Sequence, residues 1–297
     1  MLSPVILFAY NRPRHLQCTL DALNKNTLAE GTELFIFCDG AKGEKDRCKV
    51  DETRSVIEQY TSISNFKKVK TFYSDENKGL ANSVISGVSQ ILQEFETVIV
   101  LEDDIVTSLD FLEYMNDCLG YYRNDGRVGA ISAYTPAFHM PRQYRHDLFL
   151  SRRGNSWGWA TWREIWEKTD WEVSDFVAFV QDKTRRDRFN ATQYRAVEML
   201  DQQMSGQIDS WAIRWDYSFF ERGLYTVYPT KTKVYNIGCD GSGTHKVNED
   251  QRNIKLEKNS YTLEPLDVNE KIIRLSSENI CCIRKIINGI IRIIKRI

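Results

Sequence analysis

The stretch VIVLEDDIVTSLDF, residues 98–111, places three adjacent acids at the end of an apolar run. The run 98–101 is short and rich in β-branched residues, which predicts a buried strand. The acids at 102–104 follow it directly, and adjacent carboxylates repel one another more strongly beside a low-dielectric core. The position of these acids therefore requires an explanation.

Three interpretations of the acidic run are open. The acids could be solvated loop residues, they could cap the next helix, or they could hold a cation. Capping is less favoured because Thr107 and Ser108 already stand before the expected helix and can cap it. A cation is favoured because ligands bind at the strand ends of open α/β sheets.

The first half of the chain alternates between the strand and helix periods. Pro13 suits the first turn of the first helix. Alternation of this kind predicts βαβ units and a mostly parallel sheet. Strands are expected at 4–10, 33–39, 68–74 and 97–103, and helices at 12–26, 50–62 and 79–95.

The composition bounds the class of protein. The chain has 297 residues, 42% of them hydrophobic and 27% charged, with a formal net charge of −1, so it is typical of a globular protein and gives no reason to expect a nucleic-acid partner. Seven cysteines without a CxxC pair argue against a disulfide framework and for a reducing compartment. The amino-terminal residues predict a strand rather than a signal peptide, and no apolar run has the length of a membrane-spanning helix.

The second half of the chain is less regular. Extended segments are expected at 127–134 and 147–153, and a helix at 209–223. Five of the seven tryptophans lie within 157–171. A polar linker is expected at 251–279.

The last segment, 280–297, is distinct. At helical spacing its isoleucines gather on one side and five cations on the other. This pattern predicts a basic amphipathic helix that lies on an anionic membrane surface. The alternative is a helix that docks on its own domain or on a partner subunit.

Loops after the expected parallel strands converge on one edge of the sheet, where the acids emerge. A cation together with Arg12 and Lys78 would form a diphosphate site. Asp39 could accept hydrogen bonds from a base or a ribose, and Asn82 follows on the same loop as Lys78. The sequence contains neither GxGxxG nor GxxxxGK[ST], so the usual dinucleotide fold and the P-loop are not expected.

Four segments, PVILFAYNRPRHLQCTLDAL, FIFCDGAKG, ENKGLANSV and VIVLEDDIVTSLDFLEYM, together resemble the nucleotide-sugar half of a GT-A glycosyltransferase. The likeness is to the family 2 transferases and, around LEDDIVTSLDFLEYM, to the N-acetylglucosaminyltransferase I family. It covers residues 1–245 and is strongest over 1–135. In these families the acidic strand end holds Mn²⁺ or Mg²⁺ against the diphosphate of a sugar nucleotide, and the acid after the second strand binds uracil or ribose.

The resemblance implies roles for individual residues. EDD departs from a strict DxD but keeps the last acid, so Asp104 is the implied metal ligand. Asp103 is kept as a partner of the nucleotide ribose or of the groups around the metal. The residues implied in nucleotide-sugar binding are Tyr10, Arg12, Asp39, Lys78, Asn82, Glu102 and Asp103.

Two later segments extend the resemblance. GT-A enzymes often close a late loop over the diphosphate with a histidine as an extra metal ligand, which implies His245; a surface histidine is the alternative. The segment GNSWGWATW would line the active site, with Trp157, Gly158 and Trp159 as a platform for the acceptor or donor sugar. Plain core is the alternative for these aromatic side chains.

An inverting transferase needs a carboxylate on the acceptor side of the sugar. The expected helix 209–223 offers Asp209 and Asp216, two turns apart and near one face. Asp209 is favoured because it begins the helix, as the base does in GT-A enzymes. Asp216 is the second choice, since a salt bridge to Arg222 or another basic residue would explain it.

These observations predict a GT-A fold, in which a mostly parallel nucleotide-binding sheet is flanked by helices and followed by an acceptor-binding half and a carboxyl-terminal amphipathic helix. The expected domain covers 1–250, with a nucleotide-sugar half (1–135) and an acceptor half (136–250). The linker 251–279 and the membrane-associating helix 280–297 follow.

The predicted activity is a metal-dependent, inverting transfer from a nucleoside-diphosphate sugar, UDP favoured, to a glycan or lipid-linked acceptor, with Mn²⁺ or Mg²⁺ as cofactor. The tail fits a bacterial cytoplasmic enzyme that is peripheral on the inner face of the membrane and works in surface polysaccharide synthesis. Two other classes stay open: a sugar-1-phosphate nucleotidyltransferase and a non-catalytic sugar-binding protein.

Overall fold

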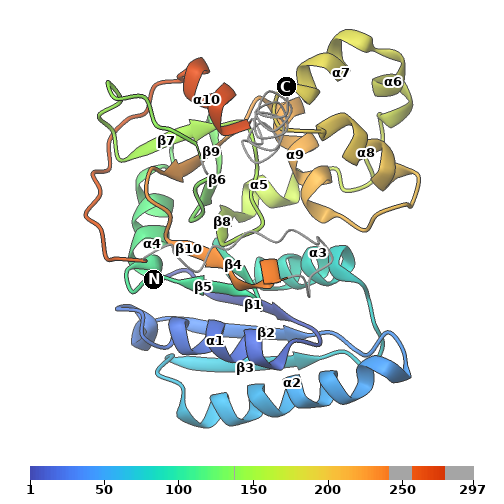
Figure 1. Ribbon diagram of the computed structural model, residues 1–297, viewed down its shortest axis with the longest axis vertical. Coiled ribbons are helices and arrows are strands. Elements are labelled where there is room, and N and C mark those ends of the chain that lie inside the picture. Colours follow the sequence, from blue (N-terminus) through green and yellow to red (C-terminus); the bar gives the residue numbers. More distant parts are fainter. Residues whose placement is uncertain (137, 241–255, 278–297) are drawn as a thin grey trace, which may run out of the picture.

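The computed structural model of the protein describes residues 1–136, 138–240 and 256–277 (Figure 1). One large sheet lies at its centre, with helices on both faces. A second sheet pairs β5 (Ile105–Thr107) with β10 (Val234–Asn236). The strands of the large sheet are β1 (Val5–Ala9), β2 (Glu33–Cys38), β3 (Lys68–Tyr73), β4 (Thr97–Glu102), β6 (Val128–Ser132), β7 (Leu148–Ser151), β8 (Trp159–Trp162) and β9 (Tyr225–Pro229).

Helices cover the two faces of the large sheet. Alternate residues of β1 divide between them: Val5 and Leu7 pack with α1, α2 and α4, whereas Ile6 and Phe8 pack with α3 and α9. The expected α/β class is therefore confirmed. The described helices are α1 (Pro13–Leu23), α2 (Glu44–Ile63), α3 (Leu80–Ile91), α4 (Phe111–Tyr121), α5 (Arg163–Glu167), α6 (Phe176–Gln181), α7 (Lys183–Asn190), α8 (Ala196–Met204), α9 (Trp211–Arg222) and α10 (Glu270–Ser277), with 3-10 turns η1 (Ala29–Gly31) and η2 (Ile237–Asp240).

The strand order is β3-β2-β1-β4-β8-β6-β9-β7. β3, β2, β1 and β4 are parallel neighbours, so their carboxyl ends share one edge. β8 inserts antiparallel between β4 and β6, and β7 closes the sheet antiparallel to β9. The expected mostly parallel sheet is confirmed, with β7 and β8 as the reversed strands.

Helix α2 begins at Glu44, earlier than the expected start at Val50. Gly43 is its N-cap, and Glu44 and Asp46 lie in its first turn, where acidic side chains suit the positive end of the helix dipole. Residues 44–49, which precede the expected helix 50–62, therefore form its first turns.

The start of α4 differs from the expected capping by Thr107 and Ser108. Thr107 ends β5, and the N-cap position belongs to Asp110. The side chain that serves the first turn comes from elsewhere: Asn26 Oδ1 accepts the Leu112 backbone N–H at 3.0 Å. The sequence could not show this cap because the acceptor is distant along the chain.

The described part of the expected linker, 256–277, packs on the domain instead of hanging from it. The Tyr261 hydroxyl donates to Asp117 at 2.7 Å, and the Tyr122 hydroxyl donates to the Glu264 carbonyl at 2.8 Å. Leu266 is buried in the core of the large sheet. We call this segment the strap; the linker prediction is wrong for it because a few apolar anchors among polar residues are enough to hold it.

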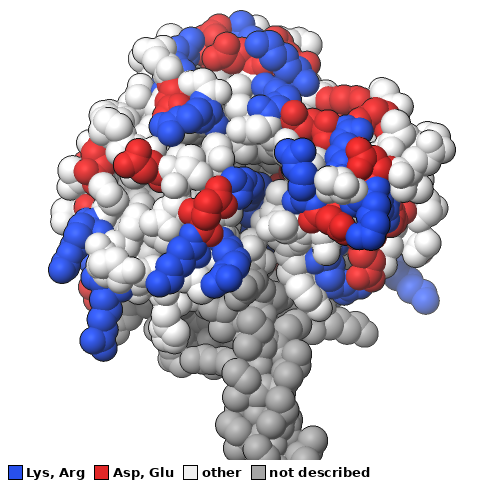
Figure 2. All heavy atoms as spheres, turned by 90° about the horizontal axis from the view of Figure 1, so that it is seen from above, with Lys and Arg blue, Asp and Glu red and all other residues white. Residues whose placement is uncertain are grey.

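The far end of the strap is helix α10, which packs beside β7 (Figure 1). Its Ile272 is buried against Phe149 and Tyr228. Figure 2 views the molecule from the α10 end, and basic and acidic side chains are interspersed over the described part of that face.

Within residues 1–136, 138–240 and 256–277, no helix has both the length and the apolar character that a membrane crossing needs. The predicted amphipathic helix 280–297 lies outside the described residues, so its membrane association stays a prediction. The division of 1–250 into two halves also stays a prediction; the large sheet takes strands from both.

Candidate active site

The carboxyl edge of β1, β2, β3 and β4 gathers the residues expected to bind the donor (Figure 1). Tyr10 follows β1, Asp39 follows β2, and Glu102 is the last residue of β4. The Tyr10 backbone N–H donates to Asp103 Oδ2 at 3.2 Å, which links the ends of two neighbouring strands. The convergence expected from the sequence is therefore present.

The acidic run 102–104 forms the turn between β4 and β5. Asp103 and Asp104 are each only 7% exposed. The Thr19 hydroxyl donates to the Asp103 carbonyl at 2.9 Å, and β5 continues into its pairing with β10. These acids are therefore neither solvated loop residues nor the cap of α4.

Burial dominates the electrostatics of this turn. It raises the pKa of Glu102 to about 8 and that of Asp103 to about 7, and the neighbouring carboxylates add to both shifts while Arg12 opposes them. The pKa of Asp104 is also raised by burial, against the Arg12 guanidinium. One arginine does not neutralise the three carboxylates of this turn, so the turn favours the uptake of protons or of a further cation.

Asp104 is held from two sides. Its Oδ2 accepts from Arg12 Nη1 at 2.7 Å, and its carbonyl accepts the Ile237 N–H at 2.9 Å. Gly238 lies so close that an added Cβ would stand 2.1 Å from Asp104 Oδ2. The turn η2 therefore covers this carboxylate, and only a glycine fits there.

The remaining oxygen, Asp104 Oδ1, is buried and has no hydrogen-bond partner. A divalent cation with oxygen ligands fits this atom and the surplus negative charge around it. The described residues contain no group of three or more His, Cys, Asp and Glu side chains arranged around a single metal position. The protein side of such a site would thus be Asp104 with few other ligands, and His245, the other expected ligand, lies outside the described residues.

Asp39 organises the loop between β3 and α3, residues 74–79, which we call the donor loop because Lys78 on it is expected to bind the donor. Its carboxylate accepts the backbone N–H groups of Lys78 (2.9 Å), Gly79 (3.2 Å) and Gly40 (3.0 Å). The side-chain amide of Asn77 donates to it at 3.1 Å. This places the exposed Lys78 beside the end of β2, while the exposed Asn82 bonds the Lys78 carbonyl from the first turn of α3.

Asn77 and Asp46 also belong to this edge of the sheet, although neither was expected there. Asp46 accepts from the Tyr10 hydroxyl at 3.0 Å and from Asn11 Nδ2 at 3.2 Å, so α2 fixes the residues after β1. Asn77 stands in the same polar loop as Lys78, a signal that could have found it. Asp46 could not be found from the sequence because it precedes the expected helix 50–62.

Asp209 lies beside the donor loop. It is exposed, its Oδ2 accepts the Ala81 N–H at 3.2 Å, and an added Cβ on Gly79 would stand 2.8 Å from it. It precedes α9 rather than beginning it, because the N-cap is Ser210, whose hydroxyl accepts the Ile213 N–H. The expected base is thus brought to the donor loop at the start of α3.

Asp216 is buried and does not pair with Arg222, and its role as the second-choice base stays a prediction. It is 5% exposed and forms no ion pair with Arg222, whose guanidinium donates to the Ile165 carbonyl. Its Oδ1 accepts the Gly154 N–H and its Oδ2 the Gln193 amide, both at 2.6 Å. Burial raises the pKa of Asp216 to about 6, against these two donors and Arg153.

The two expected platform tryptophans separate. Trp159 is 1% exposed and stacks with Trp166 and Trp211, at centroid distances of 5.6 and 4.9 Å. Its expected role as a sugar platform is therefore wrong, and the alternative of plain core holds.

Trp157 is half-buried and meets Tyr134 edge-on, with centroids 4.6 Å apart. The β4–β8 pairing ends at Val100 and Trp159, so β8 begins beside β4 two residues before Glu102. Gly158 turns the chain between the tryptophans with φ of +72°, a conformation that suits glycine.

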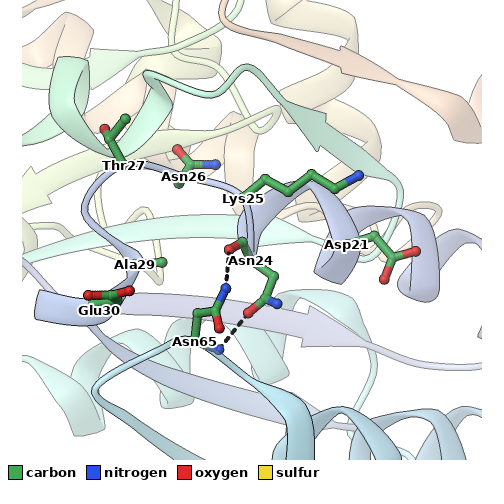
Figure 3. Close-up of a pocket in the computed structure, with 8 residues that line it drawn as sticks. All are labelled: Asp21, Asn24, Lys25, Asn26, Thr27, Ala29, Glu30 and Asn65. Carbon is green, nitrogen blue, oxygen red and sulfur yellow. Dashed lines mark hydrogen bonds between the residues drawn. The ribbon is translucent and has the colours of Figure 1, made fainter.

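A polar hollow of about 420 Å³ lies at the opposite edge of the sheet, around the end of α1 (Figure 3). The Asn65 backbone N–H donates to Asn24 Oδ1 at 2.7 Å, and the Asn65 amide donates to the Asn24 carbonyl at 3.1 Å. These groups satisfy one another, so the hollow shows no convergent chemistry comparable to that of the acidic turn.

The large sheet flanked by helices, with the residues after its parallel strands gathered at one edge, is that of a GT-A fold. The chain belongs to glycosyl transferase family 2, whose family model matches residues 5–184. No curated protein matches the chain in sequence. The likeness to the N-acetylglucosaminyltransferase I family stays a prediction.

Several solved structures are similar in fold. TarS of S. aureus has 12% identity and a TM-score of 0.46, covering 80% of this chain and 36% of that one. Mouse xyloside xylosyltransferase 1 in its apo form has 9% identity and a TM-score of 0.39, covering 80% and 86%. UDP-glucose pyrophosphorylase complexed with UDP-glucose has 11% identity and a TM-score of 0.41, covering 80% and 94%. These TM-scores carry no functional argument, so the assignment rests on the family match.

Proposed function

We propose that the protein is a metal-dependent, inverting glycosyltransferase that moves a sugar from a nucleoside-diphosphate sugar, with UDP as the favoured nucleotide, to a hydroxyl of a glycan or lipid-linked acceptor. The observation that carries this proposal is the acidic turn 102–104, in which Asp103 and Asp104 are buried and Asp104 Oδ1 has no hydrogen-bond partner. Membership of glycosyl transferase family 2 supports the reaction class.

The donor half of the site would bind the nucleotide diphosphate at the carboxyl edge. Asp104 would hold Mn²⁺ or Mg²⁺, which neutralises the leaving diphosphate when bound. Arg12 and Lys78 supply further positive charge for the phosphates. Asp39 and the backbone of the loop that it organises would face the base or ribose.

Asp209 is the proposed base. Its carboxylate takes the proton of the acceptor hydroxyl, the acceptor oxygen bonds to the anomeric carbon, and the bond from that carbon to the diphosphate oxygen breaks. The nucleoside diphosphate leaves with the electron pair. The exposure of Asp209 and its place beside the donor loop support this role, whereas the burial of Asp216 opposes it.

The proposed setting is the inner face of a bacterial membrane, in surface polysaccharide synthesis. Its support is the isoleucine and cation pattern of residues 280–297. Co-sedimentation with anionic vesicles should be lost when the chain ends at Asn279, and unchanged sedimentation would contradict the proposed setting.

Product identification tests the reaction class. The protein is incubated with a panel of sugar nucleotides and p-nitrophenyl glycosides, in Mn²⁺ or in EDTA. Release of a nucleoside diphosphate that requires Mn²⁺ is expected. Formation of a sugar 1-phosphate from pyrophosphate would instead establish a nucleotidyltransferase, and nucleotide binding indifferent to EDTA without turnover would establish a sugar-binding protein.

Asp209→Asn tests the base. We expect kcat to fall by about 10²–10⁴-fold, the usual contribution of a positioned base, with little change in the KM for the donor. Asp187→Asn, an exposed carboxylate on α7, is the matched control and should keep full activity. Normal turnover by Asp209→Asn would remove it from the mechanism.

A further inference from the structure

Asp216 is a buried carboxylate in the middle of α9 that the proposed reaction does not use. Both of its oxygens are bonded, Oδ1 to the Gly154 N–H and Oδ2 to the Gln193 amide, each at 2.6 Å. None of the ion pairs among the described residues includes it, and such a carboxylate is costly to bury. We therefore ask which part of the protein Asp216 holds in place.

What it holds is the backbone of the loop between β7 and β8. The Tyr228 hydroxyl lies within hydrogen-bond distance of the Gly154 carbonyl, at 2.9 Å, and of the Arg153 carbonyl, at 3.1 Å. Gly154 is therefore bonded through its N–H by α9 and through its carbonyl by β9. We call Asp216, Gln193 and Tyr228 the loop clamp.

The clamp leaves room for glycine alone at position 154. An added Cβ would stand 2.2 Å from Asp216 Oδ1 and 3.3 Å from Trp215 Cδ1. Trp215 is buried in the tryptophan cluster and cannot move aside. The close approach of Gly154 to α9 is thus built into the packing.

The clamped loop leads into β8, the neighbour of the strand that ends at the acids. Asn155 Oδ1 accepts the Trp157 N–H at 3.2 Å, and Asn155 Nδ2 donates to the Ser132 hydroxyl at 2.9 Å. Trp157 then packs on Tyr134, and β8 begins two residues later at Trp159, which pairs with Val100 of β4. An indole face and a side-chain amide at this end of the loop suit a sugar ring.

We propose that residues 153–157 form the acceptor subsite and that Asp216 is a positioning residue, which fixes the place of Asn155 and Trp157 by holding Gly154. This inference rests on the proposed function for the identity of the ligand. The clamp itself rests only on the hydrogen bonds of Asp216, Gly154 and Tyr228.

Three variants separate positioning from catalysis. Asp216→Asn keeps an oxygen for the Gly154 N–H, and a flipped Gln193 can accept from its new amide, so the clamp survives. Asp216→Ala removes the acceptor, and Gly154→Ala forces the loop away from α9. Asp201→Ala, which removes a half-exposed carboxylate paired with Arg186, is the control for loss of an acid on the same layer.

The first readout needs no substrate. Hydrogen–deuterium exchange of peptides covering 150–158 should accelerate at least tenfold in Asp216→Ala and Gly154→Ala, and stay near wild type in Asp216→Asn and Asp201→Ala. Peptides covering 75–82, in the donor loop, should not change in any variant. Unchanged exchange of 150–158 in Asp216→Ala would overturn the clamp.

The second readout is kinetic. With the most active sugar nucleotide of a UDP-glucose, UDP-galactose and UDP-N-acetylglucosamine panel, Asp216→Ala should raise the KM for a p-nitrophenyl glycoside acceptor about tenfold or more. Its rate of donor hydrolysis by water should stay within about twofold of wild type. A fall in the rate of donor hydrolysis as large as the fall in acceptor transfer would contradict a positioning role limited to the acceptor.

The Asp216→Asn variant tests whether Asp216 is instead the catalytic base. Near-normal transfer is expected, whereas an inactive Asp216→Asn with normal exchange would make Asp216 the base and overturn the proposal. If the wild-type protein releases no nucleotide from any donor, the proposed function fails, and the exchange experiment still decides whether the clamp exists.

Discussion

The donor edge and the 153–157 loop lie on neighbouring strands, β4 and β8, yet carboxylates serve them in opposite ways. At the donor edge Asp39 and Asp103 emerge directly from strand ends and take hydrogen bonds from nearby backbone. In the loop, the backbone of Gly154 is held by Asp216, a carboxylate from the middle of a distant helix. An acid at a strand end therefore organises the loops of its own sheet edge, whereas an acid in the middle of a helix holds a loop of another part of the fold.

The tryptophans sharpen this comparison most strongly. Replacing Trp159 by Ala empties the centre of the buried cluster, so we expect a loss of about 5 kcal/mol in the free energy of unfolding, the upper end for such truncations. Trp157→Ala should cost only about 1 kcal/mol, because Trp157 is half-buried at the margin of the core, where it meets Tyr134 edge-on.

Urea denaturation measures both tryptophan variants. Acceptor transfer should fall in Trp157→Ala while the protein remains folded. Equal destabilisation by the two substitutions would break the distinction between core and site in this segment.

The buried ion pair of Lys233 and Asp110 offers a second comparison, with the exposed ion pairs of the surface. Lys233 Nζ donates to Asp110 Oδ2 at 2.6 Å and to the Asn259 carbonyl at 3.1 Å, with both charged side chains about 2% exposed or less. Lys233 immediately precedes β10, the partner of β5, so it joins the strap to the strand that follows the acids.

Lys233→Met keeps the length of the side chain but leaves Asp110 buried and unpaired. We expect a loss of about 3–4 kcal/mol in the free energy of unfolding, measured in urea. Lys183→Met, which breaks an exposed pair with Asp187, is the control and should cost less than about 0.5 kcal/mol. A cost as small as that of the control would show that the pair does not hold the strap.

The smallest effect concerns the pH dependence of stability at Asp216. Burial raises its pKa from 3.8 to about 6, so the protonated form is favoured in the folded protein. The raised pKa therefore adds to the free energy of unfolding of the wild type, relative to Asp216→Asn. This contribution is complete below about pH 4 and is lost as the pH rises through 6. Each pKa unit corresponds to about 1.4 kcal/mol, so the two proteins should diverge by roughly 3 kcal/mol at most.

Thermal unfolding between pH 4 and 8 measures this divergence. It should open between pH 4 and 6 and stay constant above, because the carboxyl is ionised in both states there. A constant difference from pH 4 to 8 would mean that Asp216 does not titrate in this range.

The sequence predicts the donor edge well because its logic is local. Each parallel strand is an apolar run, and the residues directly after β1, β2 and β4 have to meet at one edge whatever the rest of the chain does. The pattern that located Glu102 also located Asp39, without any knowledge of side-chain contacts.

The other half depends on contacts that no local pattern shows. Whether Trp157 or Trp159 faces the core depends on β8 inserting antiparallel beside β4. Asp216 meets Gly154 only through the packing of α9 against the β7–β8 loop, and the strap is held by anchors such as Tyr261 far from their partners. These features became visible only with the fold.

The role of Asp104 is tested most directly by calorimetric titration of UDP into the wild-type protein and into Asp104→Asn, each with Mn²⁺ and with EDTA. The wild type should bind UDP at least tenfold more tightly in Mn²⁺, because the unpartnered Asp104 Oδ1 is the proposed protein ligand. Asp104→Asn should bind equally weakly in both conditions while its thermal unfolding shows an intact fold. Wild-type affinity for UDP that is the same in Mn²⁺ and EDTA would contradict the assignment of the acidic turn as a metal–diphosphate site.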